Sequence, residues 1–249
     1  MIERVKRNLK RTRCFHSINL LDSSLKYAQE NDLSYLAFLD HLLSRECSYR
    51  DQTAIDRNLK KSNLPFLKTF DDFDYSYQHA VSKRLVAEWE TFDWLDKREN
   101  KVFMGPPGVG KTHLAVALGY AAVQRGYQVK FYPMNDLVDE MLLASYDEKF
   151  KDWLKRTAKH DLIIIDEIGY LPVKATVASL FFQLINELYE LRSVVITSNK
   201  LVQEWGSAFG DHVITSAILD RLLHHAQAII IEGDSYRLKG KINEKSVTV

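Results

Sequence analysis

A glycine-rich stretch, GPPGVGKTHLA at residues 105–115, constrains the fold of this chain more than any other feature. An apolar run ends just before it at Met104, and an apolar helical pattern begins at about Lys111. Strand, glycine-rich turn and helix in this order, with the pattern G-x-x-x-x-G-K-[ST], predict a loop whose backbone N–H groups surround phosphate oxygens. An ordinary strand–helix turn is the alternative, and the complete pattern strongly disfavours it. The predicted phosphate-binding residues are Gly105, Pro106, Pro107, Gly108, Val109, Gly110, Lys111, Thr112 and His113.

The sequence around this loop predicts alternating strands and helices. Short apolar runs typical of buried strands lie at 101–104, 128–132, 161–166, 193–199 and 226–233. Helical patterns lie between them at 111–125, 135–157, 175–191 and 215–225. This alternation favours an α/β fold with a central, mainly parallel five-stranded sheet and helices on both faces. In such sheets ligands bind beyond the carboxyl ends of the strands.

The distribution of glycine indicates a domain boundary. Residues 1–104 contain no glycine, and all ten glycines lie between 105 and 240. Residues 1–62 predict a small all-helical domain that binds DNA or a partner. Residues 63–80 predict a linker, because Pro65 disfavours helix before it. The aromatic residues of this linker are expected to pack on the following domain, 81–249; they are Phe66, Phe70, Phe73 and Tyr75.

Positive charge is concentrated in the helical front of the chain. The whole chain has a formal net charge of +1, but residues 1–13 hold six Lys/Arg and one Glu. Such a segment binds nucleic acid or an anionic membrane, or is simply a solvated terminus. The candidate DNA-contacting residues are Arg4, Lys6, Arg7, Lys10, Arg11, Arg13, Arg57, Lys60 and Lys61.

The patterns of cysteine, histidine and apolar residues exclude several other classes of protein. Cys14 and Cys47 form no CxxC pair, and no apolar run has the length of a membrane span, so we expect a cytoplasmic protein that does not bind a membrane. The eight histidines lack metal-ligand spacing. His224 and His225 are neighbours on a predicted helix and are not expected to face one site, so the only metal we predict is Mg²⁺.

Two acidic residues complete the predicted phosphate site. Asp166 and Glu167 follow the apolar run LIII, where a buried strand reaches its exposed end. Lys111 is expected to neutralise the β- and γ-phosphates, and Thr112 and Asp166 to hold Mg²⁺. Glu167 is expected to orient or deprotonate the attacking water. An acidic helix N-cap is the alternative, and the upstream phosphate loop disfavours it.

Three further polar residues are candidates for sensing the nucleotide. Asn199 ends the run SVVITSN and could contact the γ-phosphate and the attacking water. Arg221 is either part of an exposed or intrahelical ion pair or a finger that reaches the nucleotide of a neighbouring subunit, and such a finger contributes about 10³–10⁵ in rate. Arg237 is a second candidate for sensing the γ-phosphate.

Six segments together resemble one known family. They are LPFLKTFDDFDY, GPPGVGKTHLA, LIIIDEIGYLP, ITSNKLVQEWGSAFGD, AILDRLLHHA and EGDSYRLK, and the resemblance extends over about residues 15–240. The chain resembles the IstB-type transposition helper ATPases of bacterial insertion sequences, which are relatives of DnaC-type helicase loaders. This resemblance implies an AAA+ P-loop fold, with Lys111 and Thr112 in the Walker A motif and Asp166 and Glu167 in Walker B. Asn199 matches the first sensor, Arg221 the arginine-finger segment and Arg237 the second-sensor position.

The resemblance also implies a function. The expected protein is an ATPase that uses ATP and Mg²⁺, self-assembles on duplex DNA through head-to-tail contacts, and delivers or activates a partner transposase during DNA recombination. Hydrolysis to ADP and phosphate is expected to dismantle the assembly. The alternatives are a replicative helicase loader, a nucleotide-gated DNA-binding scaffold with little turnover and, less favoured, a small-molecule kinase. Because eighteen residues follow Ile231, the ATPase domain is expected to have a reduced lid.

Overall fold

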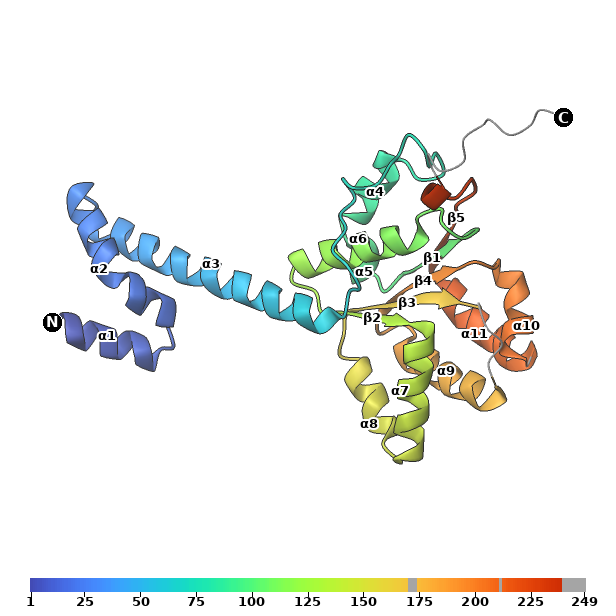
Figure 1. Cartoon of the computed structure of the whole chain (residues 1–249). Coiled ribbons are helices and arrows are strands. Elements are labelled where there is room, and N and C mark those ends of the chain that lie inside the picture. The colour runs from blue at the N-terminus through green and yellow to red at the C-terminus, as the bar shows by residue number, and fades with distance from the viewer. Residues whose placement is uncertain (170–173, 211, 239–249) are drawn as a thin grey trace. The chain divides into compact units, whose positions relative to one another are not determined.

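The structure, a computed structural model, describes residues 1–169, 174–210 and 212–238 (Figure 1). The chain divides into two compact units, Met1–Arg57 and Asn58–Val249, and each is described by itself. The expected reduced lid falls largely on 239–249, which lie outside the described residues.

The first unit is helical. It contains α1 (Ile2–Arg11), α2 (Phe15–Glu30) and most of α3 (Tyr35–Ser62). Glu46 of α3 is only 4% exposed, and its carboxylate accepts hydrogen bonds from the backbone N–H and hydroxyl of Ser17 at 2.7 and 2.9 Å. The same carboxylate pairs with Arg50 Nε at 2.9 Å. A buried charge with these partners fixes α2 against α3.

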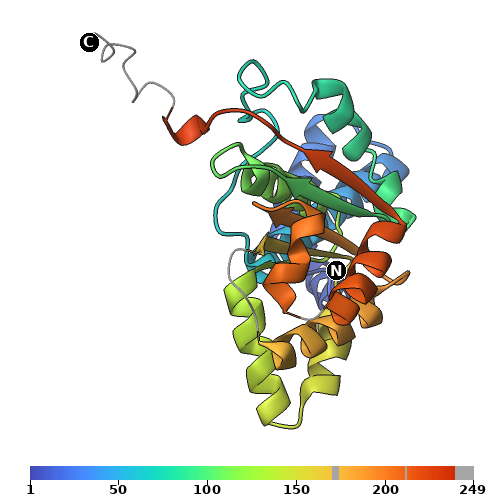
Figure 2. The ribbon, with the colours of Figure 1, turned by 90° about the vertical axis from the view of Figure 1, so that its right-hand side faces the viewer.

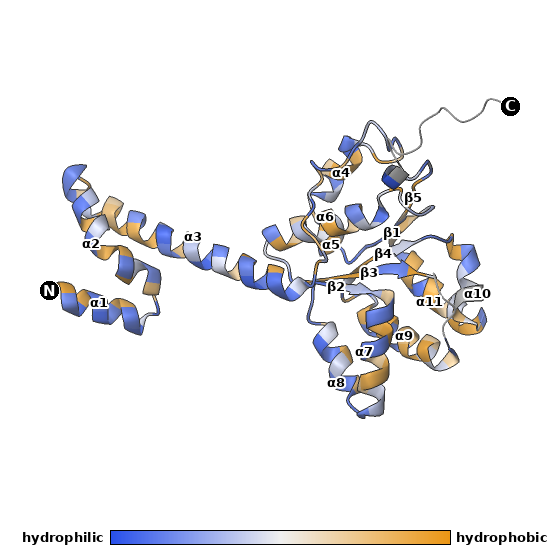
Figure 3. Ribbon diagram, viewed as in Figure 1, coloured by the Kyte–Doolittle hydropathy of each residue, from blue (hydrophilic) through white to orange (hydrophobic). Residues whose placement is uncertain are grey.

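The second unit contains a parallel five-stranded sheet, as predicted, in the order β2-β3-β4-β1-β5. Figure 2 shows β5 beside β1 at one edge of this sheet. Strand β3 is buried along almost its whole length and is mostly hydrophobic (Figure 3), as expected of a strand covered on both faces. The strands are β1 (Asn100–Met104), β2 (Val129–Pro133), β3 (Leu162–Ile168), β4 (Ser193–Ser198) and β5 (Ala226–Ile230).

Helices cover both faces of the sheet and give three layers (Figure 1). On one face, α6 (Lys111–Gln124) approaches so closely that a Cβ atom on Gly119 would lie 2.6 Å from Ile164 Cδ1. On the other face of the sheet, Ile163 and Ile165 form one continuous hydrophobic core with side chains from a second set of helices. These helices are α7 (Met134–Tyr146), α8 (Phe150–Thr157), α9 (Ala175–Leu188), α10 (Trp205–Phe209) and α11 (His212–His224).

One helix prediction is wrong. The segment 135–157 was expected to be continuous, but α7 ends at Tyr146 and α8 begins at Phe150. Between them Glu148 has φ 58, a left-handed conformation that a continuing helix cannot contain.

The remaining short elements are α4 (Lys83–Trp89), α5 (Asp93–Asp96), η1 (Val202–Glu204) and η2 (Tyr236–Leu238).

Candidate nucleotide-binding site

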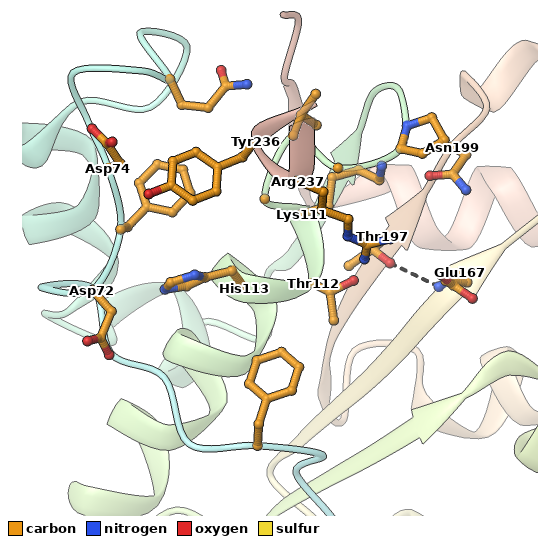
Figure 4. A pocket seen from close by; sticks show the side chains of 17 residues that line it. Asp72, Asp74, Lys111, Thr112, His113, Glu167, Thr197, Asn199, Tyr236 and Arg237 are labelled. Atoms are coloured by element: carbon orange, nitrogen blue, oxygen red, sulfur yellow. Dashed lines mark hydrogen bonds between the residues drawn. The ribbon is translucent and has the colours of Figure 1, made fainter. Parts of the chain in front are cut away.

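A cavity of about 240 Å³ lies where the carboxyl ends of β1, β3 and β4 meet the N-terminus of α6 (Figure 4). Five segments distant in sequence line it: the linker, the loop before α6 with the first turn of that helix, the end of β3, the end of β4, and the segment around η2. From the predicted set, the lining residues are Pro107, Gly108, Val109, Gly110, Lys111, Thr112, His113, Glu167, Asn199 and Arg237. Others that line it were not predicted as site residues: Phe66, Asp72, Phe73, Asp74, Gln78, Thr197 and Tyr236.

Two of the glycines in the loop before α6 show how closely other segments approach this loop. Gly108 has φ 84, and a Cβ atom there would lie 2.0 Å from Ser235 Oγ. Gly110 has φ 99, and a Cβ atom there would lie 2.7 Å from Phe73 Cε2. The loop is therefore held between the linker on one side and the segment before η2 on the other, where Tyr236 N–H also donates to Gly108 O at 3.0 Å.

Lys111 is buried at the start of α6. Its Nζ donates to the carbonyl oxygens of Gly105 and Pro106 at 2.8 and 2.7 Å. Burial lowers the pKa of Lys111 to about 8, although the charges of Asp166 and Glu167 act in the opposite direction. A buried ammonium whose hydrogen bonds go to carbonyl oxygens is well suited to pair with an incoming phosphate.

Thr112 of α6 and Asp166 of β3 lie within hydrogen-bond distance of each other. Thr112 Oγ1 donates to Asp166 Oδ1 at 2.9 Å, and Thr197 Oγ1 donates to the same carboxylate. A hydroxyl and a carboxylate this close form an all-oxygen donor set, the kind that Mg²⁺ prefers. Residues Thr112 and Asp166 therefore fit a magnesium ion.

Glu167 is presented to the cavity by an irregularity in β3. The pairing of β3 with β4 shifts between Ile165 and Ile168, and Glu167 has φ 66 at this bulge. Its N–H donates to Thr197 Oγ1 at 2.9 Å (Figure 4), so the backbone is fixed while the carboxylate remains exposed. Bulges commonly redirect side chains next to active sites.

The linker forms the other wall. His113 Nε2 lies 2.9 Å from Thr69 O, and its ring meets Phe73 edge-to-face. Phe70 and Phe73 are buried, and their rings meet those of Trp89 and His113 in the segment that follows the linker, but Phe66 is 44% exposed and lines the cavity. Spacing alone gives no sign that linker residues face the same cavity as the glycine-rich loop, because the contact depends on the fold.

The two arginine candidates occupy different places. Arg237 lines the cavity, even though the predicted lid is short. Arg221 does not line it: its Nε donates to Asn186 Oδ1 at 3.1 Å, and its guanidinium lies over the Phe182 ring. No intrahelical ion pair of Arg221 is seen among the described contacts: its side chain donates to Asn186 of α9 and to the backbone carbonyl of Ala217 in its own helix.

The expectation that His224 and His225 cannot face one site is wrong. Helix α11 ends at His224, so helical geometry does not constrain His225. Ligand atoms of both histidines and of Glu190 lie within 4.8 Å of one another, and all three residues are exposed.

The predicted DNA-contacting residues are mostly exposed. Lys6 is an exception because it is half-buried. Its Nζ pairs with Asp22 at 2.8 Å, and this contact raises the pKa of Lys6. The exposed members are Arg4, Arg7, Lys10, Arg11, Arg13, Arg57, Lys60 and Lys61.

The parallel five-stranded sheet in this order, together with the glycine-rich loop and the acidic end of β3, defines a P-loop domain of the AAA+ type. The family described as "IstB-like ATP binding protein" matches residues 8–244, and the chain belongs to this family. It is 41% identical over 233 residues to the ATP-binding protein named for insertion sequence IS21 of Pseudomonas aeruginosa, covering 94% of this chain and 88% of the relative. The protein named for IS5376 of Geobacillus stearothermophilus is also 41% identical, covering 87% and 86%.

Solved structures support the fold. DnaI matches with a TM-score of 0.56 and 19% identity, covering 66% of this chain and 90% of that one. AMPPCP-bound DnaA from Aquifex aeolicus matches with a TM-score of 0.53 and 24% identity, covering 69% of this chain and 52% of DnaA. Among the described residues, no helix combines the length and apolar composition that crossing a membrane requires.

Proposed function

We propose that the protein is an ATP-hydrolysing helper of DNA transposition that assembles on duplex DNA and acts on a partner transposase. The observation that carries this proposal is the convergence of Lys111, Thr112 and Glu167 on one cavity, with Asp166 hydrogen-bonded to Thr112. The names of the relatives, which are ATP-binding proteins of insertion sequences, supply the biological setting.

In this proposal the nucleotide phosphates lie over the loop 105–110 and the N-terminus of α6. Lys111 exchanges the carbonyls of Gly105 and Pro106 for the β- and γ-phosphate oxygens. Thr112 and Asp166 hold Mg²⁺, which neutralises phosphate charge when bound. The backbone N–H groups of the loop add hydrogen bonds at no reorganisation cost.

Glu167 acts as the general base. Its carboxylate accepts a proton from a water molecule, whose oxygen forms a bond to the γ-phosphorus. The bond from the γ-phosphorus to the bridging oxygen breaks, and ADP and phosphate are the products. Asn199 and Arg237, which line the same cavity, contact the γ-phosphate side.

Arg221 serves the nucleotide of a neighbouring subunit. It lies outside its own chain's cavity, as a residue acting across a subunit boundary must. A site completed by the next copy produces a head-to-tail interface, and such interfaces generate rings or helical filaments. Nucleotide binding is thereby coupled to the assembly of subunits.

The exposed cations of α1 and of the end of α3 contact DNA phosphates in this proposal. Such contacts are largely independent of sequence and weaken steeply with salt.

Electron microscopy of the protein with duplex DNA tests the proposed function. We expect regular assemblies with ATP and their loss with ADP. Glu167→Gln should retain the assemblies after prolonged incubation because hydrolysis is blocked. Equal coating of DNA with ATP, with ADP and without nucleotide would contradict the proposal. A preference for single strands over duplexes would favour the helicase-loader alternative.

A further inference from the structure

The cavity has two chemically different ends (Figure 4). Thr197, Glu167 and Asn199 lie on one side, at the ends of β3 and β4. Asp72, Asp74 and His113 lie on the other, where the linker approaches α6. Aromatic rings from Phe66, Phe73 and Tyr236 line the cavity as well. A nucleotide also has two different ends, with charged phosphates at one and a flat, partly apolar base at the other.

Gln78 is an unusual residue in this cavity. It is 3% exposed, and its Nε2 has no hydrogen-bond partner among the described residues. A buried amide NH₂ without a partner destabilises a folded protein, so such groups in native structures call for an explanation. Because Gln78 lines the cavity, a bound ligand can supply the missing acceptor.

The backbone of Gln78 is fixed by the turn that precedes it. Its N–H donates to Asp74 O at 3.1 Å, and Asp74 Oδ1 accepts from the N–H groups of Ser76 and Tyr77 at 3.1 and 3.2 Å. The side chain rests against Gly233, where a Cβ atom would lie 3.2 Å from Gln78 Nε2. Burial restricts the side chain before any ligand binds, which lowers the entropic cost of binding.

The segment that carries Gly233 is itself attached to the linker. The Tyr77 ring meets the Tyr236 ring edge-to-face, and Tyr77 OH donates to Ser235 O at 3.4 Å. The turn 74–78 and the segment 233–236 thus form one wall, which continues to Gly108 of the phosphate loop through Tyr236 N–H.

We propose that Gln78 binds the 6-amino edge of an adenine base and makes the site selective for ATP over GTP. Nε2 donates to N7 and Oε1 accepts from the 6-amino group, as a glutamine does when it reads adenine. Guanine presents two acceptors on this edge, O6 and N7, and a carboxamide, with one donor side and one acceptor side, cannot satisfy both in either orientation. This inference rests on the proposed nucleotide site and adds a base-recognition residue to it.

Binding of nucleotides tests the inference, with Mg²⁺ present and fluorescence or calorimetry as the readout. For the wild type we expect ATP to bind at least about tenfold more tightly than GTP and than purine riboside triphosphate, which lacks the 6-amino group. Gln78→Leu should weaken ATP binding about tenfold, leave GTP binding nearly unchanged and remove both preferences. Gln183→Leu, which removes an exposed amide on α9, is the matched control and should change neither.

A purely structural role for Gln78 gives different results. If its amide supported the fold, Gln78→Leu would lower the melting temperature of the nucleotide-free protein, whereas we expect no decrease because an unpartnered amide is removed. An ATP to GTP preference that survives in Gln78→Leu overturns the inference while leaving the nucleotide site intact. Equal wild-type affinity for ATP and purine riboside triphosphate also overturns it. Failure of the wild type to bind any triphosphate contradicts the proposed function itself.

Discussion

Gly110→Ala probes the contact between the phosphate loop and the linker. Gly110 has φ 99, and an L-residue held in left-handed backbone costs about 1–2 kcal/mol. The new Cβ would lie 2.7 Å from Phe73 Cε2, although ordinary contacts begin at 3.4 Å, so the ring must move by about 0.7 Å (3.4 − 2.7). Such overpacking costs about 1–3 kcal/mol. The expected loss of unfolding free energy is therefore about 2–5 kcal/mol.

Gly126→Ala is the matched control. Gly126 has φ 91, but a Cβ atom there meets nothing within 4 Å, so only the backbone strain of about 1–2 kcal/mol applies. Urea unfolding followed by tryptophan fluorescence measures both losses, because all four tryptophans lie beyond residue 81 and report on the second unit. ATP binding should weaken at least about tenfold in Gly110→Ala and stay unchanged in Gly126→Ala.

A double-mutant cycle with Phe73→Ala separates the backbone strain at Gly110 from the contact between the new Cβ and the Phe73 ring. In that background the cost of Gly110→Ala should fall to that of Gly126→Ala, while the cost of Gly126→Ala stays the same. Equal costs for the two alanine substitutions in the wild-type background, or a Gly110→Ala cost unchanged by Phe73→Ala, would refute the reasoning.

Three other predictions concern catalysis, assembly and pH. Glu167→Gln should bind ATP normally and hydrolyse it about 10²–10⁴-fold more slowly; hydrolysis at the normal rate would exclude Glu167 as the base. Arg221→Ala and Lys111→Met should each be inactive alone, and their mixture should regain ATPase activity, because one supplies nucleotide and the other supplies the arginine; a mixture without activity contradicts action across subunits. Burial lowers the pKa of Lys101 to about 8, below its ordinary 10.5, so the unfolded state binds more protons between these values and stability rises with pH there, by at most about 1.4 kcal/mol per unit. Lys111 has a similarly lowered pKa and contributes a rise of its own, so Lys101→Met should lose only the part due to Lys101. Lys97→Met, at an exposed position, should keep the whole rise when urea unfolding is measured from pH 7 to 10.

Local sequence patterns were sufficient to predict the strands and the phosphate loop. Runs such as LIII are too apolar and too short to be anything but buried strands once helices alternate with them. Gly110 and Lys111 fall where the pattern places them, at the turn and the first residue of α6. These features depend on neighbours in sequence, which is why they can be predicted.

Features that depend on tertiary contacts could not be predicted. The shifted pairing after Ile165 redirects Glu167, but nothing in the sequence indicates a bulge there. Gln78 and Tyr236 meet at the cavity although they are far apart in the chain. The end of α7 before Glu148 is likewise a backbone change that the continuous helical pattern conceals.

The central claim is that a nucleoside triphosphate binds at the carboxyl edge of the sheet through Lys111. Calorimetric titration of wild type and Lys111→Met with ATP and Mg²⁺ tests it most directly, with circular dichroism to show that both proteins are folded. The account predicts one ATP per wild-type chain and no measurable binding to the folded variant. Wild-type affinity in Lys111→Met would contradict it.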